Sequence, residues 1–214
     1  SIVRMAKTAG EVVANSRFCA ELYRRMGVHV SGVVYPPLDC GFFSPTTSRP
    51  SDDYVLLYVG KETDFRVARA LADAGVKIVA FGSKLPEVVP RSFSRHPSVE
   101  MLGHVDDEEL RELYSNALYT LFPSLHEPFG YIAVESMACG TPVLVYGREG
   151  PSETVLDGLT GWHANGPREM VRKGLELWRE GYDEASMRKA CRERALLFDV
   201  ERITSQWLRV LGLE

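Results

Sequence analysis

The sequence predicts an α/β protein in which a Rossmann-like parallel sheet of about six strands is followed by a helical C-terminal tail. Short apolar runs alternate with segments of helical periodicity through most of the chain. From Pro167 onward only helical patterns remain. Repeated strand–helix–strand units form right-handed crossovers, so the strands should be parallel. We expect one domain over residues 1–214, with a core at about 28–165 and a tail at 166–214.

The expected strands are short and apolar, and most of them lead into a helix. A first strand at 30–37 is closed by two prolines, and the run 54–60 ends in a glycine. Glycines should stop two helices at Gly75 and Gly140, and Asp106 should cap a third. The remaining strands are expected at 76–82, 99–105, 118–124 and 142–147, and the helices at 14–27, 64–75, 106–117 and 129–139.

Composition excludes several classes of function. The formal net charge of -4 argues against a protein that grips nucleic acid through phosphate contacts. The four cysteines form no C-x-x-C pair, and the five histidines show no metal-ligand spacing, so we expect no metal site. No apolar run of about 18 residues and no signal peptide is present in this sequence.

Ligands of open parallel sheets bind beyond the carboxyl ends of the strands, and three loops there carry reactive side chains. These loops are 60–64, 126–130 and 148–153. Neither G-x-G-x-x-G nor G-x-x-x-x-G-K-[ST] occurs after a strand. The ligand is therefore expected to be anionic and nucleotide-like, but not NAD or Mg-ATP bound in those ways.

The segment HEPFGYIAVESMACG, residues 126–140, holds two glutamates eight positions apart. A helix that begins near Phe129 leaves its first amides, at Phe129, Gly130 and Tyr131, free for an anion such as phosphate. Glu127 precedes this helix and Glu135 lies within it. Two carboxylates from one loop and its own helix fit poorly to a glycoside hydrolase, whose carboxylates flank one bond. They are better suited to accept hydroxyl hydrogen bonds from a sugar and a ribose.

The same segment resembles the E-x7-E region of family 4 retaining glycosyltransferases, which have the GT-B fold. The resemblance covers roughly residues 12–165 in the right order. It is carried by the segments ANSRFCAELYRRMGV, YPPLDCGFF, GHVDDEELRELYSNALYTLFPS, EPFG…ESMACGTPV and GPSETVLDGLTGW.

The resemblance implies the donor-binding, C-terminal half of a two-domain enzyme that transfers a sugar from a nucleotide diphosphate sugar with retention of configuration. Such enzymes need no cofactor, and the donor would be a UDP-, GDP- or ADP-sugar. Glu127 would be the catalytic-site glutamate that contacts the donor sugar, and Glu135 would hold the ribose hydroxyls. The other donor-binding residues would be Gly60, Lys61, Arg66, His104, Val105, Asp107, Phe129, Gly130 and Tyr131.

The sequence departs from the family pattern in two respects, and several residues have an alternative role. Arg66 is the nearest candidate for the family's second basic residue, so diphosphate binding by two cations is in doubt. The family's N-terminal acceptor domain, expected to be a partner here, lies outside this sequence. Glu127 would alternatively cap the helix that follows it, and Lys61 would be a solvated loop residue. Asp107 would select guanine or would simply be an acid in a first helical turn.

At the level of the whole protein, the acceptor would be a sugar or a lipid-linked glycan. We place the enzyme in the cytoplasm, with peripheral contact at the inner membrane surface as an alternative. The basic residues of the tail (Arg188, Lys189, Arg192 and Arg194) are expected on a solvated helix face. The competing interpretation is a non-catalytic nucleotide-sugar-binding module that needs a partner subunit. A sugar epimerase is a third, but it needs acid–base residues that the sequence does not show.

Overall fold

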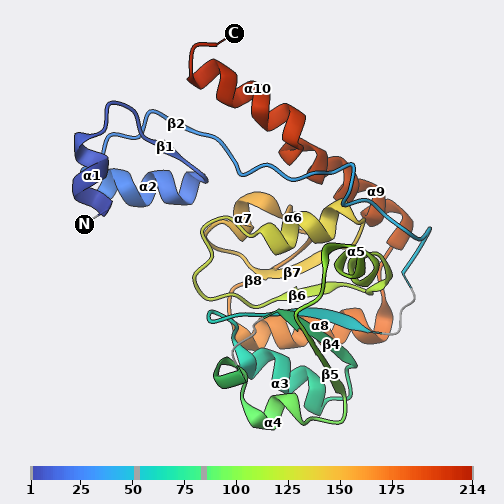
Figure 1. Ribbon diagram of the computed structural model, residues 1–214. Coiled ribbons are helices and arrows are strands. Elements are labelled where there is room, and N and C mark those ends of the chain that lie inside the picture. Colours follow the sequence, from blue (N-terminus) through green and yellow to red (C-terminus); the bar gives the residue numbers. More distant parts are fainter. Residues whose placement is uncertain (1, 51–53, 83–85, 214) are drawn as a thin grey trace.

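The computed structural model describes residues 2–50, 54–82 and 86–213, and within them a six-stranded parallel sheet forms the centre of the molecule (Figure 1). The strand order is β5-β4-β3-β6-β7-β8. The strands are β3 (Val55–Val59), β4 (Ile78–Gly82), β5 (Val99–Gly103), β6 (Thr120–Phe122), β7 (Val143–Tyr146) and β8 (Gly161–Ala164). The predicted α/β class with a parallel sheet of six strands is confirmed.

Helices cover both faces of the sheet, because the strands are apolar on both faces. In β3, Leu56 packs into one core while Val55 and Leu57 pack into the other, as the alternation of side chains along a strand requires. One face carries α5 (Asp107–Asn116), α6 (Tyr131–Ala138) and α9 (Glu184–Ala195); the other carries α3 (Phe65–Asp73), α4 (Arg91–Ser94) and α8 (Pro167–Glu180).

Local signals in the sequence set several of the helix ends. The Asp106 carboxylate accepts from the amide of Glu109, and Ser16 caps α2 (Arg17–Arg25) by accepting from the amide of Cys19. Gly75 and Gly140 adopt positive φ angles of 86° and 85° directly after α3 and α6. The predicted cap at Asp106 and the predicted stops at Gly75 and Gly140 are confirmed.

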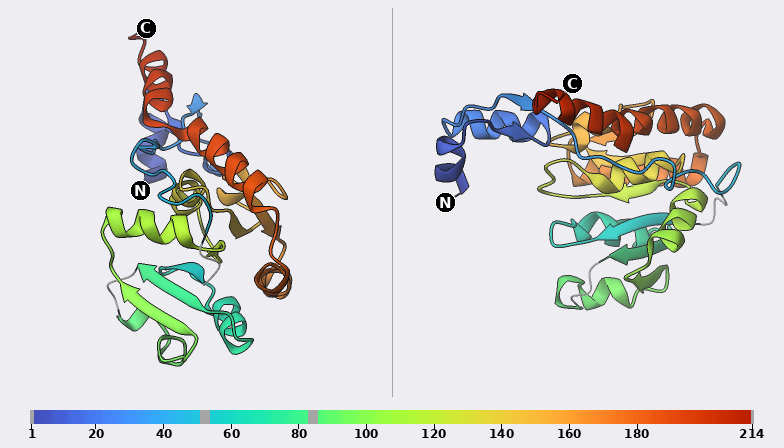
Figure 2. Two further views of the ribbon diagram at one scale, coloured as in Figure 1. Left: turned by 90° about the vertical axis from the view of Figure 1, so that its right-hand side faces the viewer. Right: turned by 45° about the horizontal axis from the view of Figure 1, so that its top comes forward.

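A small unit precedes the sheet and has its own core. It comprises α1 (Ile2–Thr8), β1 (Val13–Ala14), α2 and β2 (Gly32–Val33), packed around Ala14, Ala20, Val28 and Val30. We call residues 2–33 the N-terminal unit. The last helix, α10 (Val200–Val210), leaves α9 through a 3₁₀ turn (Leu196–Phe198) and runs back toward this unit (Figures 1 and 2). Two short elements complete the chain, a 3₁₀ turn (Pro86–Val88) and α7 (Pro151–Thr154).

The strand predicted over 30–37 is confirmed only in part. Only Gly32 and Val33 are in a strand, and they pair with β1 outside the main sheet. The rest of this apolar run is an extended connection between the two units: Val28 and Val30 pack in the N-terminal unit, while Leu38 and Cys40 pack against the sheet. The sixth strand of the sheet is instead β8, which was not predicted.

The expectation of a solvated basic face on the tail is also wrong. Arg192 donates to the carbonyl oxygens of Phe43, Ala138 and Cys40, at 2.7, 2.9 and 2.6 Å. The carbonyls of Thr47 and Ser115 accept from Arg188, and those of Thr154 and Glu153 accept from Arg194. Lys189 alone of the four stays exposed. Irregular segments and helix ends leave carbonyl oxygens without backbone partners. The arginines donate to these oxygens and so hold the tail against the sheet unit.

Candidate functional site

A hollow of about 320 Å³ lies beyond the carboxyl ends of β3, β4 and β5, against α5 and α6. We call it the edge hollow. It brings together four of the residues that the sequence predicts to bind the donor: His104, Val105, Asp107 and Glu135. His104 and Asp107 are exposed at its mouth, and Val105 is buried. Its other lining residues are Tyr58, Phe81, Gly82, Leu110 and Ile132.

Glu135 is the carboxylate of this hollow, and the fold holds one of its oxygens. The Tyr114 hydroxyl donates to Glu135 Oε2 at 2.9 Å. Within the described residues, Oε1 makes no hydrogen bond to the protein. Burial raises the pKa of Glu135, the hydrogen bond from Tyr114 opposes this, and the nearby charge of Asp107 adds to the increase. A half-buried carboxylate with one unbonded oxygen is a strong acceptor for hydroxyl groups.

Aromatic rings fix Tyr114 in place. Its fully buried ring meets Phe81 edge to face, with centroids 5.9 Å apart, and Phe81 meets Tyr58 in the same way at 5.6 Å. Tyr114 lies on α5 and Glu135 on α6, so the hydrogen bond also joins the two helices that wall the hollow. The sequence interpretation missed Tyr114, although a buried glutamate in an apolar helix implies a partner.

Glu127 holds the turn that leads into helix α6. Its Oε1 atom accepts from the amides of Phe129 and Gly130, at 3.2 and 3.0 Å. Gly130 sits at the N-cap with φ 95°, a conformation that favours glycine. Two of the three predicted anion-binding amides are therefore occupied by the protein's own carboxylate, while Glu127 Oε2 has no hydrogen bond among the described residues. Tyr131 follows as the first residue of α6 and is exposed.

A second loop, after β7, clamps Glu127. The Glu149 carboxylate accepts from the amide of Glu127 at 2.8 Å, and the amide of Gly150 donates to the Glu127 carbonyl at 2.9 Å. A Cβ atom at Gly150 would lie 2.3 Å from the amide nitrogen of Phe129, so only glycine fits. Glu149 has φ 56°, a strained value for a side chain other than glycine, which often marks a functional loop. No sequence pattern indicates this clamp, apart from the position of its loop after a strand.

Gly60 and Lys61 lie on the loop after β3, at the same edge of the sheet. This loop is hydrogen-bonded to the loop after β6, through Leu125 to Glu62 and Asp64 to Pro123. Lys61 is exposed and forms no ion pair within the described part of the chain. Because its loop is hydrogen-bonded to residues 123–125, the Lys61 side chain is available to an anion near Glu127. Lys61 does not line the edge hollow.

Arg66 is not brought to the edge hollow. Its guanidinium makes two hydrogen bonds of 2.8 Å to the carboxylate of Asp64, which is buried and also accepts from the Tyr146 hydroxyl. The hydrogen bond from Arg66 and a weaker one from Tyr146 lower the pKa of Asp64 against the opposing effect of burial. Arg66 lines a separate groove between α3 and α8, with Ala70 and Val171. Its expected contact with a diphosphate has no support in this geometry.

No group of three or more His, Cys, Asp or Glu side chains in residues 2–50, 54–82 and 86–213 is arranged to hold a metal ion. None of the helices formed by those residues is long and apolar enough to cross a membrane.

Residues 93–197 match the family described as glycosyl transferases group 1. This part of the chain belongs to the family. A glycosyltransferase of Methanocaldococcus jannaschii, itself uncharacterized, is 32% identical over 51% of this chain and 31% of its own length. The D-inositol 3-phosphate glycosyltransferase of Mycobacterium tuberculosis is 30% identical over 63% of this chain and 32% of its own. The chain spans less than half the length of the curated relatives it matches.

Solved structures with the same fold cover nearly the whole chain. A sucrose-phosphate synthase from Thermosynechococcus elongatus superposes with a TM-score of 0.83 at 25% identity, over 99% of this chain and 60% of that one. The HepE protein of Anabaena, solved with UDP and glucose, gives 0.84 at 22% identity, over 98% and 65%. The fold is therefore the predicted half of the GT-B architecture.

Proposed function

We propose that this chain binds a nucleotide diphosphate sugar and forms the donor half of a glycosyltransferase that retains the configuration of the transferred sugar. The observation that carries the proposal is the edge hollow, where Glu135 presents one unbonded carboxylate oxygen beside His104, Val105 and Asp107. Crevices beyond the carboxyl ends of parallel strands are where such sheets bind nucleotides. The HepE protein, which has this fold, was solved with UDP and glucose.

In this proposal the nucleoside occupies the edge hollow. Glu135 Oε1 accepts from the ribose hydroxyls while Tyr114 keeps Oε2 in place. The base lies near His104 and Val105, where backbone groups follow the end of β5. Asp107 is exposed at the mouth and would accept from the N–H groups of guanine, which favours GDP over UDP if that contact forms.

The diphosphate and sugar would lie along the loop that contains Glu127. For the amides of Phe129, Gly130 and Tyr131 to bind phosphate or sugar oxygens, the Glu127 carboxylate must leave them, because Oε1 occupies two of the three. We infer that the donor replaces this carboxylate at the helix N-terminus, and that Glu127 then accepts from a sugar hydroxyl. Lys61 would balance the diphosphate charge.

The complete reaction needs more than this chain. We propose that an acceptor-binding domain provides the other wall of the cleft and binds an acceptor sugar or a lipid-linked glycan. The expected place of the reaction is the cytoplasm, with peripheral contact at the membrane if the acceptor is lipid-linked. The alternative is a nucleotide-sugar-binding module that has no transferase activity without a partner subunit.

Calorimetry of this chain against UDP, GDP, ADP and their sugars tests the proposal directly. We expect at least one nucleoside diphosphate to bind, and Glu135→Ala to weaken it by about tenfold or more, since a hydrogen bond to a charged group contributes about 1.5–3 kcal/mol. Glu180, exposed at the end of α8, provides a matched control: Glu180→Ala should leave the affinity unchanged. Failure of all three nucleotides to bind would refute the donor-site assignment.

Transfer itself requires a separate measurement. The chain joined to an acceptor domain should produce a glycoside with the same anomeric configuration as the donor, as NMR of the product would show. An inverted product would contradict retention while leaving nucleotide binding intact.

A further inference from the structure

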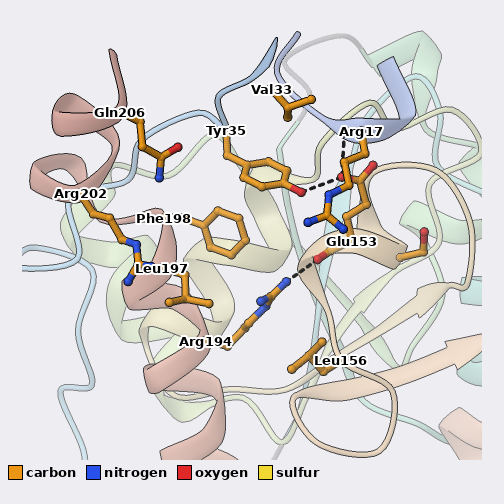
Figure 3. A pocket seen from close by; sticks show the side chains of 11 residues that line it. Arg17, Val33, Tyr35, Glu153, Leu156, Arg194, Leu197, Phe198, Arg202 and Gln206 are labelled. Atoms are coloured by element: carbon orange, nitrogen blue, oxygen red, sulfur yellow. Dashed lines mark hydrogen bonds between the residues drawn. The ribbon is translucent and has the colours of Figure 1, made fainter. Parts of the chain in front are cut away.

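A second hollow, of about 650 Å³, lies where the N-terminal unit meets the sheet unit, and its tyrosine is bound by the fold (Figure 3). Glu153 accepts from the amides of Arg17 and Phe18, at 2.9 and 2.6 Å. It therefore caps the N-terminus of α2 from another part of the chain. The Tyr35 hydroxyl donates to the same carboxylate at 2.9 Å. These contacts join the two units, so the Tyr35 hydroxyl is not free for a ligand.

The edge hollow, by contrast, contains a tyrosine hydroxyl without a partner. Tyr58, on β3, lines this hollow together with Glu135. Among the nine tyrosines, all of which the structure describes, only Tyr58 and Tyr23 have a hydroxyl that makes no hydrogen bond to the described residues. No buried side-chain oxygen in that part of the chain lacks a partner, so the Tyr58 hydroxyl is accessible rather than enclosed.

Two glycines and two aromatic rings fix the Tyr58 ring. A Cβ atom at Gly60 would lie 2.8 Å from Tyr58 Cε1, and one at Gly82 would lie 3.0 Å from Cε2 on the opposite edge of the ring. The rings of Phe81 and Phe122 meet the Tyr58 ring edge to face, with centroids 5.6 and 6.4 Å away. The ring therefore lies across the ends of β3 and β4, where the glycines leave room for it.

The hydroxyl of this ring lies beside the loop that carries Lys61. The Tyr58 oxygen is 3.3 Å from the position that a Cβ atom would occupy at Gly60. The loop is held in this place, because the Gly60 amide donates to the Thr63 hydroxyl at 2.8 Å. Lys61 is the next residue along the chain after Gly60. The Tyr58 hydroxyl is thus at the base of the loop whose lysine is proposed to balance a diphosphate.

The same hydroxyl is near the pair formed by Tyr114 and Glu135. Burial and then Glu135 are the main causes that raise the pKa of Tyr114, and Tyr58 is among the smaller ones. Such an electrostatic effect requires two groups to be close. The Tyr58 hydroxyl is therefore near both the carboxylate proposed to hold the ribose and the base of the Lys61 loop. In a nucleoside diphosphate, the first phosphate connects the ribose to the second phosphate.

We propose that the Tyr58 hydroxyl donates to the first phosphate of the bound nucleotide, an inference that rests on the function proposed above. A phenol that donates to a phosphate oxygen makes a charge-assisted hydrogen bond. Because the glycines and rings fix its aromatic group, this donor is in place before the ligand arrives and loses little freedom on binding. Tyr58 would thus distinguish a nucleotide from a nucleoside, as Lys61 would distinguish a diphosphate from a monophosphate.

Three ligands that share one nucleoside test this contact. The nucleoside, its 5′-monophosphate and its 5′-diphosphate, in the uridine, guanosine and adenosine series, are titrated into the parent chain and Tyr58→Phe by NMR. We expect Tyr58→Phe to raise the Kd of the monophosphate and of the diphosphate by the same factor, about tenfold, and to leave that of the nucleoside unchanged. Tyr23→Phe is the matched control, because the unbonded hydroxyl of Tyr23 belongs to a ring that packs in the N-terminal unit. It should change none of these affinities.

Phosphorus NMR of the bound diphosphate examines the contact itself. Tyr58→Phe should move the ³¹P signal of the first phosphate and leave that of the second in place. Equal weakening of nucleoside and nucleotides, weakening of the diphosphate alone, or unchanged affinities in Tyr58→Phe would overturn the role of Tyr58 while nucleotide binding by the parent chain stands. Failure of every ligand to bind the parent chain would refute the donor site, and the contact of Tyr58 with it.

Discussion

Tyr114→Phe tests the arrangement on which the proposed donor site depends. The substitution removes the one hydroxyl that donates to Glu135 Oε2, at 2.9 Å, and keeps the ring that packs against Phe81. A half-buried carboxylate then loses a hydrogen bond from a fully buried donor. Hydrogen bonds to charged groups contribute about 1.5–3 kcal/mol, so we expect the free energy of unfolding at neutral pH to fall by about 2 kcal/mol.

The pH dependence of this loss has a definite sign. Burial raises the pKa of Glu135 and the Tyr114 hydrogen bond lowers it, so Tyr114→Phe should raise it further. A group whose folded-state pKa is raised contributes stability below its unfolded pKa and loses it as the pH rises through the folded pKa. The cost of Tyr114→Phe should therefore shrink in acid. If nucleotide binding needs ionised Glu135, affinity should fall at a higher pH in the variant than in the parent as the pH is lowered.

Urea unfolding in a double-mutant cycle with Glu135→Gln measures the pairwise energy. We expect Tyr114→Phe to cost at least about 1 kcal/mol less in the Glu135→Gln background. Tyr119→Phe is the matched control, because Tyr119 is equally buried and its hydroxyl donates to the neutral carbonyl of Gly174 at 3.0 Å. Equal costs for Tyr114→Phe in both backgrounds, or a cost that does not change with pH, would refute the reasoning.

Three further substitutions test the supports of the site. In urea unfolding, the Glu149→Gly variant should be about 1 kcal/mol more stable than the Glu149→Ala variant. Both variants lose the hydrogen bond to the Glu127 amide, but only alanine keeps the backbone strain of φ 56°. Equal stabilities of the two variants would argue against strain. Arg192→Ala should lower the free energy of unfolding by about 2–4 kcal/mol, since three carbonyls lose their donor, whereas Lys189→Ala should change it by less than about 0.5 kcal/mol. Glu153→Ala should speed amide hydrogen exchange in α2 and leave the central strands protected; uniform exchange across both would contradict its role as a remote cap.

The sheet could be predicted from the sequence because a central strand is buried on both faces. Such a strand needs apolar side chains at successive positions, and these appear as a continuous apolar run. It could not predict β8, because Gly161-Trp162-His163-Ala164 is short and contains a polar residue, and its place at the sheet edge depends on pairing with β7. The run at 30–37 was predicted as a longer strand of the main sheet for the opposite reason. An apolar extended segment that connects two units has the same residue pattern as a strand. The pattern does not show whether the segment pairs with another strand, or with which one.

The site was predictable where a family resemblance reached it, and not where it depends on contacts between distant residues. The resemblance implied that His104, Val105, Asp107 and Glu135 bind one donor, and the structure brings all four to one hollow at the ends of the strands. Tyr114 lies 21 positions before its partner Glu135, and Glu149 lies 22 positions after Glu127. Only packing selects such pairs. The same applies to the arginines of α9, whose partners are carbonyls that no sequence pattern marks.

The two glutamates of residues 126–140 share one physical arrangement. In each carboxylate the protein binds one oxygen: the amides of Phe129 and Gly130 hold Oε1 of Glu127, and Tyr114 holds Oε2 of Glu135. Each second oxygen makes no hydrogen bond among the described residues. A carboxylate held in this way has little conformational freedom left to lose, so a ligand hydroxyl can bind it at low entropic cost.

The two carboxylates differ in the groups that hold them. Tyr114 is a buried side chain and can stay in place when ligand binds, whereas the amides that hold Glu127 are themselves the groups an anion would bind. Glu135 should therefore act as a fixed acceptor and Glu127 as one that moves when the diphosphate arrives.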